Sequence, residues 1–169
     1  MEDIYIEYLP KLNEHLEAYS LYESKTHLKI IDKVVSILLI VFGVIILSMS
    51  LIYGFSISNI MIAILLMVIG IADFMGFIDF GKIVISIQFK NNNKLKDIQK
   101  IKFRDNGLEY ETKGIKSNIK WELYTKYYEG ENIFILIYGN RLYSVIPKYA
   151  LNNKLELFRN MVDKKIKRI

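Results

Sequence analysis

Two long apolar runs interrupt an otherwise polar chain and predict its most distinctive elements. Val34–Tyr53 holds no charged residue over 20 positions, and Ile60–Ile78 follows after six uncharged residues that favour a turn. A helix of about 20 residues crosses the roughly 30 Å hydrocarbon core of a bilayer. We therefore predict two membrane-spanning helices, 34–53 and 60–78, in a hairpin that occupies residues 34–80.

Lysines flank this hairpin on one side only. Lys25, Lys29 and Lys33 precede the first run, Lys82 and Lys90 follow the second, and the connection between the runs has no Lys or Arg. Cytoplasmic flanks of membrane helices carry an excess of basic residues. We therefore expect a multi-pass protein of the cytoplasmic membrane with both termini in the cytoplasm. A cleaved signal peptide does not fit, because its apolar region is shorter and lies nearer the N-terminus.

The segment before the hairpin, residues 1–33, predicts a short strand and a helix. Ile4–Tyr8 alternates between apolar and polar positions, and Pro10 suits the first turn of a following helix. Leu12 and Leu16 then recur at helical spacing. This helix is expected either to lie on the membrane surface or to cover the core of the C-terminal domain.

From Asp97 onward the apolar period changes to two, which predicts a β-domain over residues 97–169 after a linker or helix extension at 81–96. Ile101 and Phe103 alternate with basic residues, and Asn106-Gly107 is a two-residue turn signal before Leu108. These features predict a β-hairpin.

Four further strands are predicted after this hairpin. Ile119 and Trp121 share one strand face, so we expect Trp121 to be buried. Leu123–Glu129 is a weaker strand, and Ile133–Tyr138 is apolar on both faces, as in a central or doubly covered strand. A turn at Gly139-Asn140 leads into the last strand.

That last strand is predicted to end at Pro147, and a C-terminal helix follows. Asn153 and Glu156 have capping-box spacing, and apolar residues then recur at helical intervals. The fold class is therefore α+β: a transmembrane hairpin and a small antiparallel β-domain of about six strands, closed by a helix. This order of elements resembles pleckstrin-homology-like domains.

Charge is distributed unevenly along the chain, whose formal net charge is +5. Residues 1–33 hold 4 lysines against 7 acidic residues, whereas residues 82–169 hold 19 Lys and Arg against 9 acidic residues, a net charge of +10. Each basic residue near an anionic leaflet contributes about 1 kcal/mol to membrane binding. Membrane lipids are therefore expected partners, and the basic run 164–168 is part of this surface. The alternative is a solvated basic face without a ligand.

The sequence gives little support to enzymatic chemistry. Cysteine is absent, His15 and His27 lie too far apart for a local metal motif, and no Gly-rich phosphate loop occurs. We expect no catalytic site, cofactor or metal. Nucleic-acid binding is not expected either, because the basic residues are spread over strands and Trp121 and Tyr110 point inward.

Three residues inside the predicted hairpin are candidate functional or interface positions. Asp73 lies about two turns from the cytoplasmic end of the second span, where a carboxylate indicates either a function or access to interfacial water. Gly43 and Gly70 are expected at similar depth in the antiparallel helices. Small residues permit close backbone approach, so we predict that the spans pack together there.

The C-terminal stretches 101–112, 119–129, 133–151 and 155–162 resemble the YcxB-like family of bacterial membrane proteins with two apolar spans. The most specific stretch is 146–151, which includes the candidate interface residues Pro147 and Lys148; the family more often has an Arg and an aromatic residue where this chain has Tyr149 and Leu151. The resemblance implies the topology above, in a bacterial cytoplasmic membrane, and it brings no catalytic motif or cofactor.

Two functional hypotheses remain. The first is a membrane-tethered binding or regulatory module whose β-domain contacts a protein partner or anionic lipid headgroups. The alternative is a small transporter or channel subunit, a homo-oligomer of the hairpin that uses Asp73.

Overall fold

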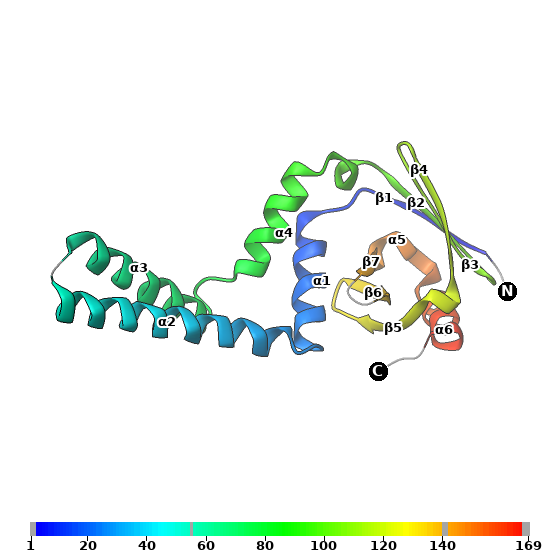
Figure 1. Cartoon of the computed structure of the whole chain (residues 1–169). Coiled ribbons are helices and arrows are strands. Elements are labelled where there is room, and N and C mark those ends of the chain that lie inside the picture. Colours follow the sequence, from blue (N-terminus) through cyan, green and yellow to red (C-terminus); the bar gives the residue numbers. More distant parts are fainter. Residues whose placement is uncertain (1–2, 55, 140–141, 167–169) are drawn as a thin grey trace. The chain divides into compact units, whose positions relative to one another are not determined.

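The computed structural model describes residues 3–54, 56–139 and 142–166, and the chain divides into two compact units. The β-domain contains both ends of the chain, Met1–Tyr22 and Val84–Ile169, and the hairpin unit spans Glu23–Ile83. Two apolar helices, antiparallel sheets and a C-terminal helix are present, so the predicted α+β class is confirmed (Figure 1).

Two long helices form the hairpin unit: α2 (Leu28–Tyr53) and α3 (Ile57–Phe74). Both are long and apolar enough to cross a membrane, and most of their large apolar side chains are exposed. Helix α2 begins six residues before the predicted span, because residues 28–33 contain no Pro or Gly that would interrupt helical hydrogen bonding. In its first turn the N–H groups of Ile30 and Ile31 both donate hydrogen bonds to the carbonyl of His27.

Helix α3 ends at Phe74, four residues before the predicted boundary, because Gly76 adopts a left-handed conformation at φ +78°. The N–H of Phe77 bonds the carbonyl of Ala72 at 2.8 Å, and the N–H of Gly76 bonds that of Asp73 at 2.9 Å. This pair of bonds is a Schellman motif. Asp73 therefore lies in the last turn of α3, and the predicted distance of two turns from the end of this helix was wrong.

The β-domain contains two antiparallel sheets, each with its strands in sequence order. The first is β1-β2-β3-β4: Ile4–Tyr8, Gln99–Arg104, Gly107–Thr112 and Ile115–Lys120. The second is β5-β6-β7: Tyr124–Glu129, Ile133–Tyr138 and Leu142–Pro147. Strand β6 lies between two neighbours, as its apolar sequence predicted.

Strand β1 pairs with β2 although the whole hairpin unit separates them in sequence. Ile4 lies opposite Phe103 and Ile6 opposite Ile101, and all four side chains are buried. The hairpin unit is therefore an insertion between two neighbouring strands of one sheet. The sequence pattern identified β1 as a strand and left its partner unassigned.

The predicted β-hairpin is present, with its turn one residue earlier than the Asn106-Gly107 signal indicated. Gly107 already pairs with Arg104, so Asp105 and Asn106 form the turn. A Cβ atom at Gly107 would overlap the carbonyl oxygen of Ile119 on β4. Glycine is required there for close approach of two strands.

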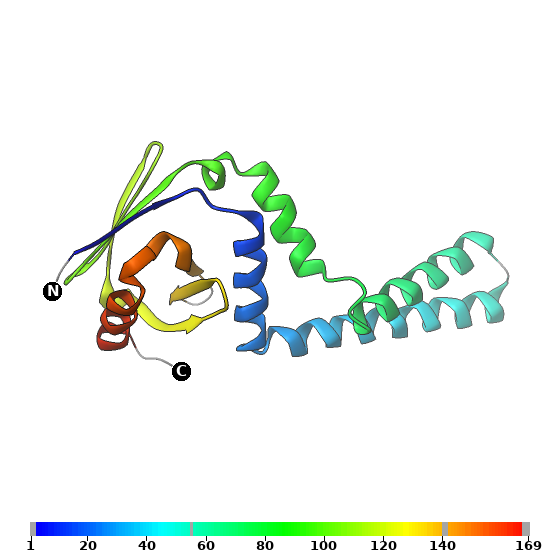
Figure 2. The ribbon, with the colours of Figure 1, turned by 180° about the vertical axis from the view of Figure 1, so that it is seen from behind.

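The part of the chain that the structure describes contains seven further helical segments. Beside α2 and α3, these are α1 (Leu12–Ser24), α4 (Phe80–Asn91), α5 (Lys148–Leu151), α6 (Leu155–Lys165), and the 3-10 helices η1 (Asn93–Lys96), η2 (Trp121–Leu123) and η3 (Asn152–Lys154). Segment 81–96 is thus mainly helical. Helices α1 and α4 lie side by side, with the rings of His15 and Phe89 5.3 Å apart (Figure 2).

Two local predictions in this part of the chain were wrong. Helix α6 begins at Leu155 with Lys154 as its N-cap and no side-chain capping bond, because Asn153 belongs to η3 and cannot act as the cap. Trp121 begins η2 instead of lying within a strand. Its predicted burial is confirmed: it is 5% exposed, and its Nε1–H donates to the carbonyl of Arg104 at 2.7 Å.

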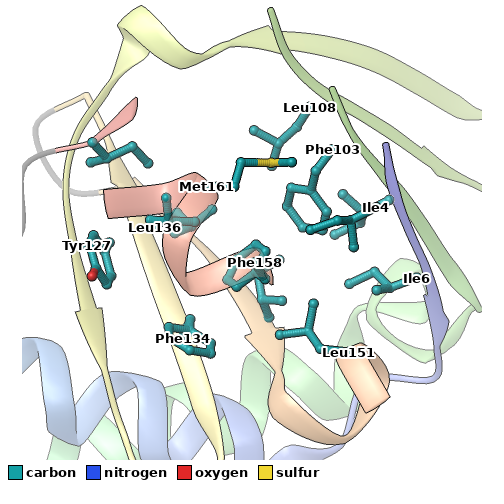
Figure 3. Close-up of a cluster of buried hydrophobic side chains, with 14 of the residues drawn as sticks. Ile4, Ile6, Phe103, Leu108, Tyr127, Phe134, Leu136, Leu151, Phe158 and Met161 are labelled. Carbon is teal, nitrogen blue, oxygen red and sulfur yellow. The ribbon is translucent and has the colours of Figure 1, made fainter. Parts of the chain in front are cut away.

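The core of the β-domain joins both sheets through α6 (Figure 3). The ring of Phe158 on α6 lies 4.9 Å from that of Phe103 on β2 and 5.1 Å from that of Phe134 on β6, in edge-to-face geometry. Such aromatic pairs contribute energy beyond their buried area. Phe158 is fully buried and contacts both sheets directly.

Candidate ligand-binding site

A cavity of about 320 Å³ lies within the β-domain and is lined by residues of both sheets. Every strand contributes, together with α1 and η1. The lining residues are Tyr8, Glu14, His15, Leu95, Gln99, Ile101, Leu108, Tyr110, Ser117, Ile119, Tyr124, Tyr138, Tyr143, Ser144 and Val145. Small-molecule pockets are typically about 300–1,000 Å³ with aromatic walls and a few polar groups. This cavity is at the small end of that range.

Strand register brings the lining residues together. Tyr110 on β3 lies opposite Ile101 on β2 and Ser117 on β4, so the three form a row across one sheet. Directly opposed residues of antiparallel strands present their side chains on the same face. On the other sheet Tyr124 lies opposite Tyr138, and their rings meet edge-on at 5.5 Å.

Hydroxyl groups supply most of the polar atoms of the cavity wall. The Tyr8 hydroxyl lies 2.8 Å from Oε1 of Gln99 and 2.8 Å from the carbonyl oxygen of Val145, so it joins the first sheet to β7. The Tyr124 hydroxyl lies 3.5 Å from Oγ of Ser144. Burial raises the pKa of Tyr124 to about 12 and raises the pKa of Tyr8 further. Both phenols are neutral near pH 7.

Glu14 and His15 are the titratable groups of the wall besides the tyrosines. Glu14, in the first turn of α1, is 7% exposed, and its carboxylate accepts the backbone N–H of Lys11 at 3.0 Å. Burial raises the pKa of the Glu14 carboxyl and lowers the pKa of the His15 imidazole. His15 is therefore neutral near pH 7. No Lys or Arg is among the described lining residues.

The six candidate residues from the sequence lie elsewhere, in two separate places. Asp73 belongs to the hairpin unit, where it is 7% exposed and accepts a hydrogen bond from the Ser36 hydroxyl of α2. Its other carboxylate oxygen, Oδ1, is buried without a hydrogen-bond partner among the described residues. Asp73 thus faces the neighbouring helix of its own hairpin.

Gly43 and Gly70 are both buried where α2 meets α3, as predicted, but they do not lie level with each other. A Cβ atom on Gly43 would lie 2.8 Å from the carbonyl oxygen of Ala63, and one on Gly70 would lie 2.8 Å from that of Ser36. Each glycine therefore faces a different small residue. The expectation of similar depth was wrong, because the short connection between Tyr53 and Ile57 sets the register of the two helices, which places Gly43 beside Met67 and Gly70 beside Ile40.

Trp121, Pro147 and Lys148 belong to the β-domain and lie outside the cavity lining. Pro147 is buried at the end of β7, an edge strand, where a missing N–H is tolerated. Lys148 Nζ and Arg159 Nη2 lie 2.8 and 2.6 Å from Oε1 of Glu129. The hydrogen bond from Arg159, with that from Lys148, lowers the pKa of Glu129 to about 2. These three side chains hold α5 and α6 against β5.

Comparison with known proteins identifies part of this domain. The family model described as YcxB-like protein matches residues 103–162, from β2 to α6, so the resemblance seen in the sequence is confirmed over that region. No curated protein and no solved structure matches the chain. Tyr8, Glu14 and Gln99 line the cavity from outside the matched region.

Proposed function

We propose that this chain, with its YcxB-like region at 103–162, is a membrane-tethered binding module. The hairpin anchors it in the cytoplasmic membrane, and the β-domain binds a small ligand in the tyrosine-lined cavity. The cavity carries the proposal: its volume, its aromatic wall and its few convergent polar groups are typical of ligand sites.

The tether is supported by exposed apolar surface and by strand pairing. Large apolar side chains cover the outer faces of α2 and α3, an arrangement suited to lipid. The pairing of β1, which precedes the hairpin, with β2, which follows it, supports a topology with both ends of the hairpin on the same side of a membrane. The flanking lysines favour the cytoplasmic side.

Single cysteines test this topology in a chain that has none of its own. We expect an impermeant thiol reagent added to intact cells to label a cysteine at Ser56, between the helices, and to leave cysteines at Ser20 and Asn153 unlabelled. All three should react after lysis. Labelling of Ser20→Cys or Asn153→Cys in intact cells would contradict the proposed orientation.

The cavity is bounded by the two segments that connect the β-domain to the hairpin, so a bound ligand can affect both. Its wall includes Glu14 and His15 of α1, the helix that precedes the hairpin in sequence. It also includes Leu95 of η1, which follows the hairpin and α4. A bound ligand would contact both connections at once. We therefore propose that occupancy of the cavity stabilises one arrangement of α1 and α4 over others.

Filling the cavity tests whether it holds a ligand in cells. Ser117→Phe places a ring inside the cavity, and Asn118→Phe adds the same ring on the exposed face of β4. We expect small molecules that co-purify with the full-length protein in mild detergent to be lost from Ser117→Phe and retained by Asn118→Phe, as measured by mass spectrometry. Identical profiles from well-folded variants would contradict the proposal.

Contact with anionic headgroups is a second candidate, supported by the net charge of +10 over residues 82–169. Many of these basic groups already have acidic partners: Lys100 with Glu7, Lys102 with Asp3, Arg104 with Glu109, Lys116 with Glu111, and Lys165 with Asp105. Residues 167 and 168 of the terminal basic run lie outside the described residues. The cavity is therefore the better supported site.

Transport through an oligomer has less support. A pore between hairpins would be lined by residues on the outer faces of the helices, and Asp73 instead bonds Ser36 within its own hairpin. We therefore propose that Asp73 stabilises the hairpin by joining α3 to α2.

A further inference from the structure

We infer that the cavity takes a small organic cation, an amine or quaternary ammonium compound whose charge lies near Glu14 and whose alkyl groups contact the tyrosine rings. This inference rests on the proposed function and names the ligand class of the same site.

The charges of the wall select against anions. Glu14 supplies a carboxylate, His15 is neutral near pH 7, and the described lining residues include no Lys or Arg. This contrasts with the net charge of +10 over residues 82–169. The positively charged side chains that could bind an anionic ligand therefore lie outside the cavity lining.

The aromatic wall is suited to a cation. Five tyrosines line the cavity: Tyr8, Tyr110, Tyr124, Tyr138 and Tyr143. The faces of aromatic rings carry negative potential and attract ammonium groups, most strongly where water is excluded. In the β-domain Lys11 and Lys126 already lie over the rings of Tyr149 and Tyr128, whereas the described residues place no such cation over a cavity tyrosine.

Glu14 provides the third argument, because its carboxylate is buried without an ion pair. No ion pair joins it to a Lys or Arg among the described residues; the backbone N–H of Lys11 and the Tyr149 side chain are its hydrogen-bond partners, and the Lys11 ammonium acts on its charge only at longer range. The Lys11 ammonium itself lies 4.4 Å from the centre of the Tyr149 ring. A buried charge is costly unless it is paired. A cationic ligand would supply the ion pair that this carboxylate lacks.

Three probes of matched shape and different charge test the inference. Choline, neutral 3,3-dimethylbutan-1-ol and anionic 3,3-dimethylbutanoate are titrated calorimetrically into the full-length protein in a maltoside detergent. We expect choline to bind about tenfold or more tightly than the alcohol, a difference of about 1.4 kcal/mol, and the anion not to bind. Glu14→Gln should weaken choline binding about tenfold and leave the alcohol unaffected, whereas the exposed control Glu122→Gln should change neither.

Tyr110→Leu keeps an apolar wall and removes one ring, so it tests the aromatic contribution independently if Glu14→Gln does not fold. It should weaken choline more than the alcohol. If the alcohol binds as tightly as choline and both are lost in Ser117→Phe, the cavity binds ligands and the cation assignment is wrong. If no probe binds and Ser117→Phe also retains every co-purified molecule, both the inference and the proposed function fail.

Discussion

Replacing Gly70 with leucine should sharply reduce the amount of folded protein in membranes. A Cβ atom at this position would lie 2.8 Å from the carbonyl oxygen of Ser36 and 3.2 Å from the backbone N of Ile40. Backbone atoms of a helix cannot move aside singly, so α2 and α3 must separate and the bond between Ser36 and Asp73 must break. Overpacking alone costs about 1–3 kcal/mol. Helices in lipid depend on such close packing for association.

Gly43→Leu should have a similar effect, because a Cβ there would lie 2.8 Å from the carbonyl oxygen of Ala63. The matched control is Ser48→Leu, which introduces the same side chain on the exposed face of α2. The measurement is the fraction of full-length protein that survives limited proteolysis of isolated membranes. Equal survival of all three variants and the wild type would refute close packing at the glycines.

Phe158→Ala should be among the most destabilising single changes in the β-domain. The variant loses ring contacts to Phe103 and Phe134, one in each sheet, and leaves a cavity at a fully buried position. Truncation of a buried Phe to Ala typically costs about 3–5 kcal/mol. At about 4 °C per kcal/mol for a domain of this size, the Tm should fall by about 12 °C or more.

Trp121 reports this transition directly, because it is the single Trp of the chain and its ring lies 6.4 Å from that of Phe103. Thermal unfolding followed by its fluorescence gives the Tm of the β-domain. Leu123→Ala is the control, since Leu123 is 58% exposed in the same short helix as Trp121. A Tm for Phe158→Ala within a few degrees of this control would show that α6 does not join the sheets.

Local pattern predicted most of the elements, because helix and strand periods are set by neighbouring residues. The two apolar helices, the first β-hairpin and the central position of β6 were all recognisable from alternation and run length. Boundaries were less predictable where one residue decides them. Gly76 ends α3 through its left-handed conformation, and a glycine inside an apolar run gives no such warning.

The cavity could not be predicted, because it depends on contacts between distant segments. Tyr110 was recognisable as inward-facing, but Tyr8 and Gln99 meet only through the pairing of β1 with β2. Glu14 looked like an ordinary helix residue, and its burial follows from where α1 packs. The position of Gly43 relative to Gly70 likewise required the register of α2 against α3, which neither apolar run reveals.

The pairing of β1 with β2 also fixes an order of events during synthesis. Ile4 pairs with Phe103, so β1 leaves the ribosome 99 residues before its partner strand. At a synthesis rate of about 5–20 residues per second, the edge of β1 remains unpaired for roughly 5–20 s. The hairpin emerges entirely within that interval, before β2 is available to pair with β1. If the hairpin is the proposed membrane anchor, it can insert before the first sheet of the β-domain forms.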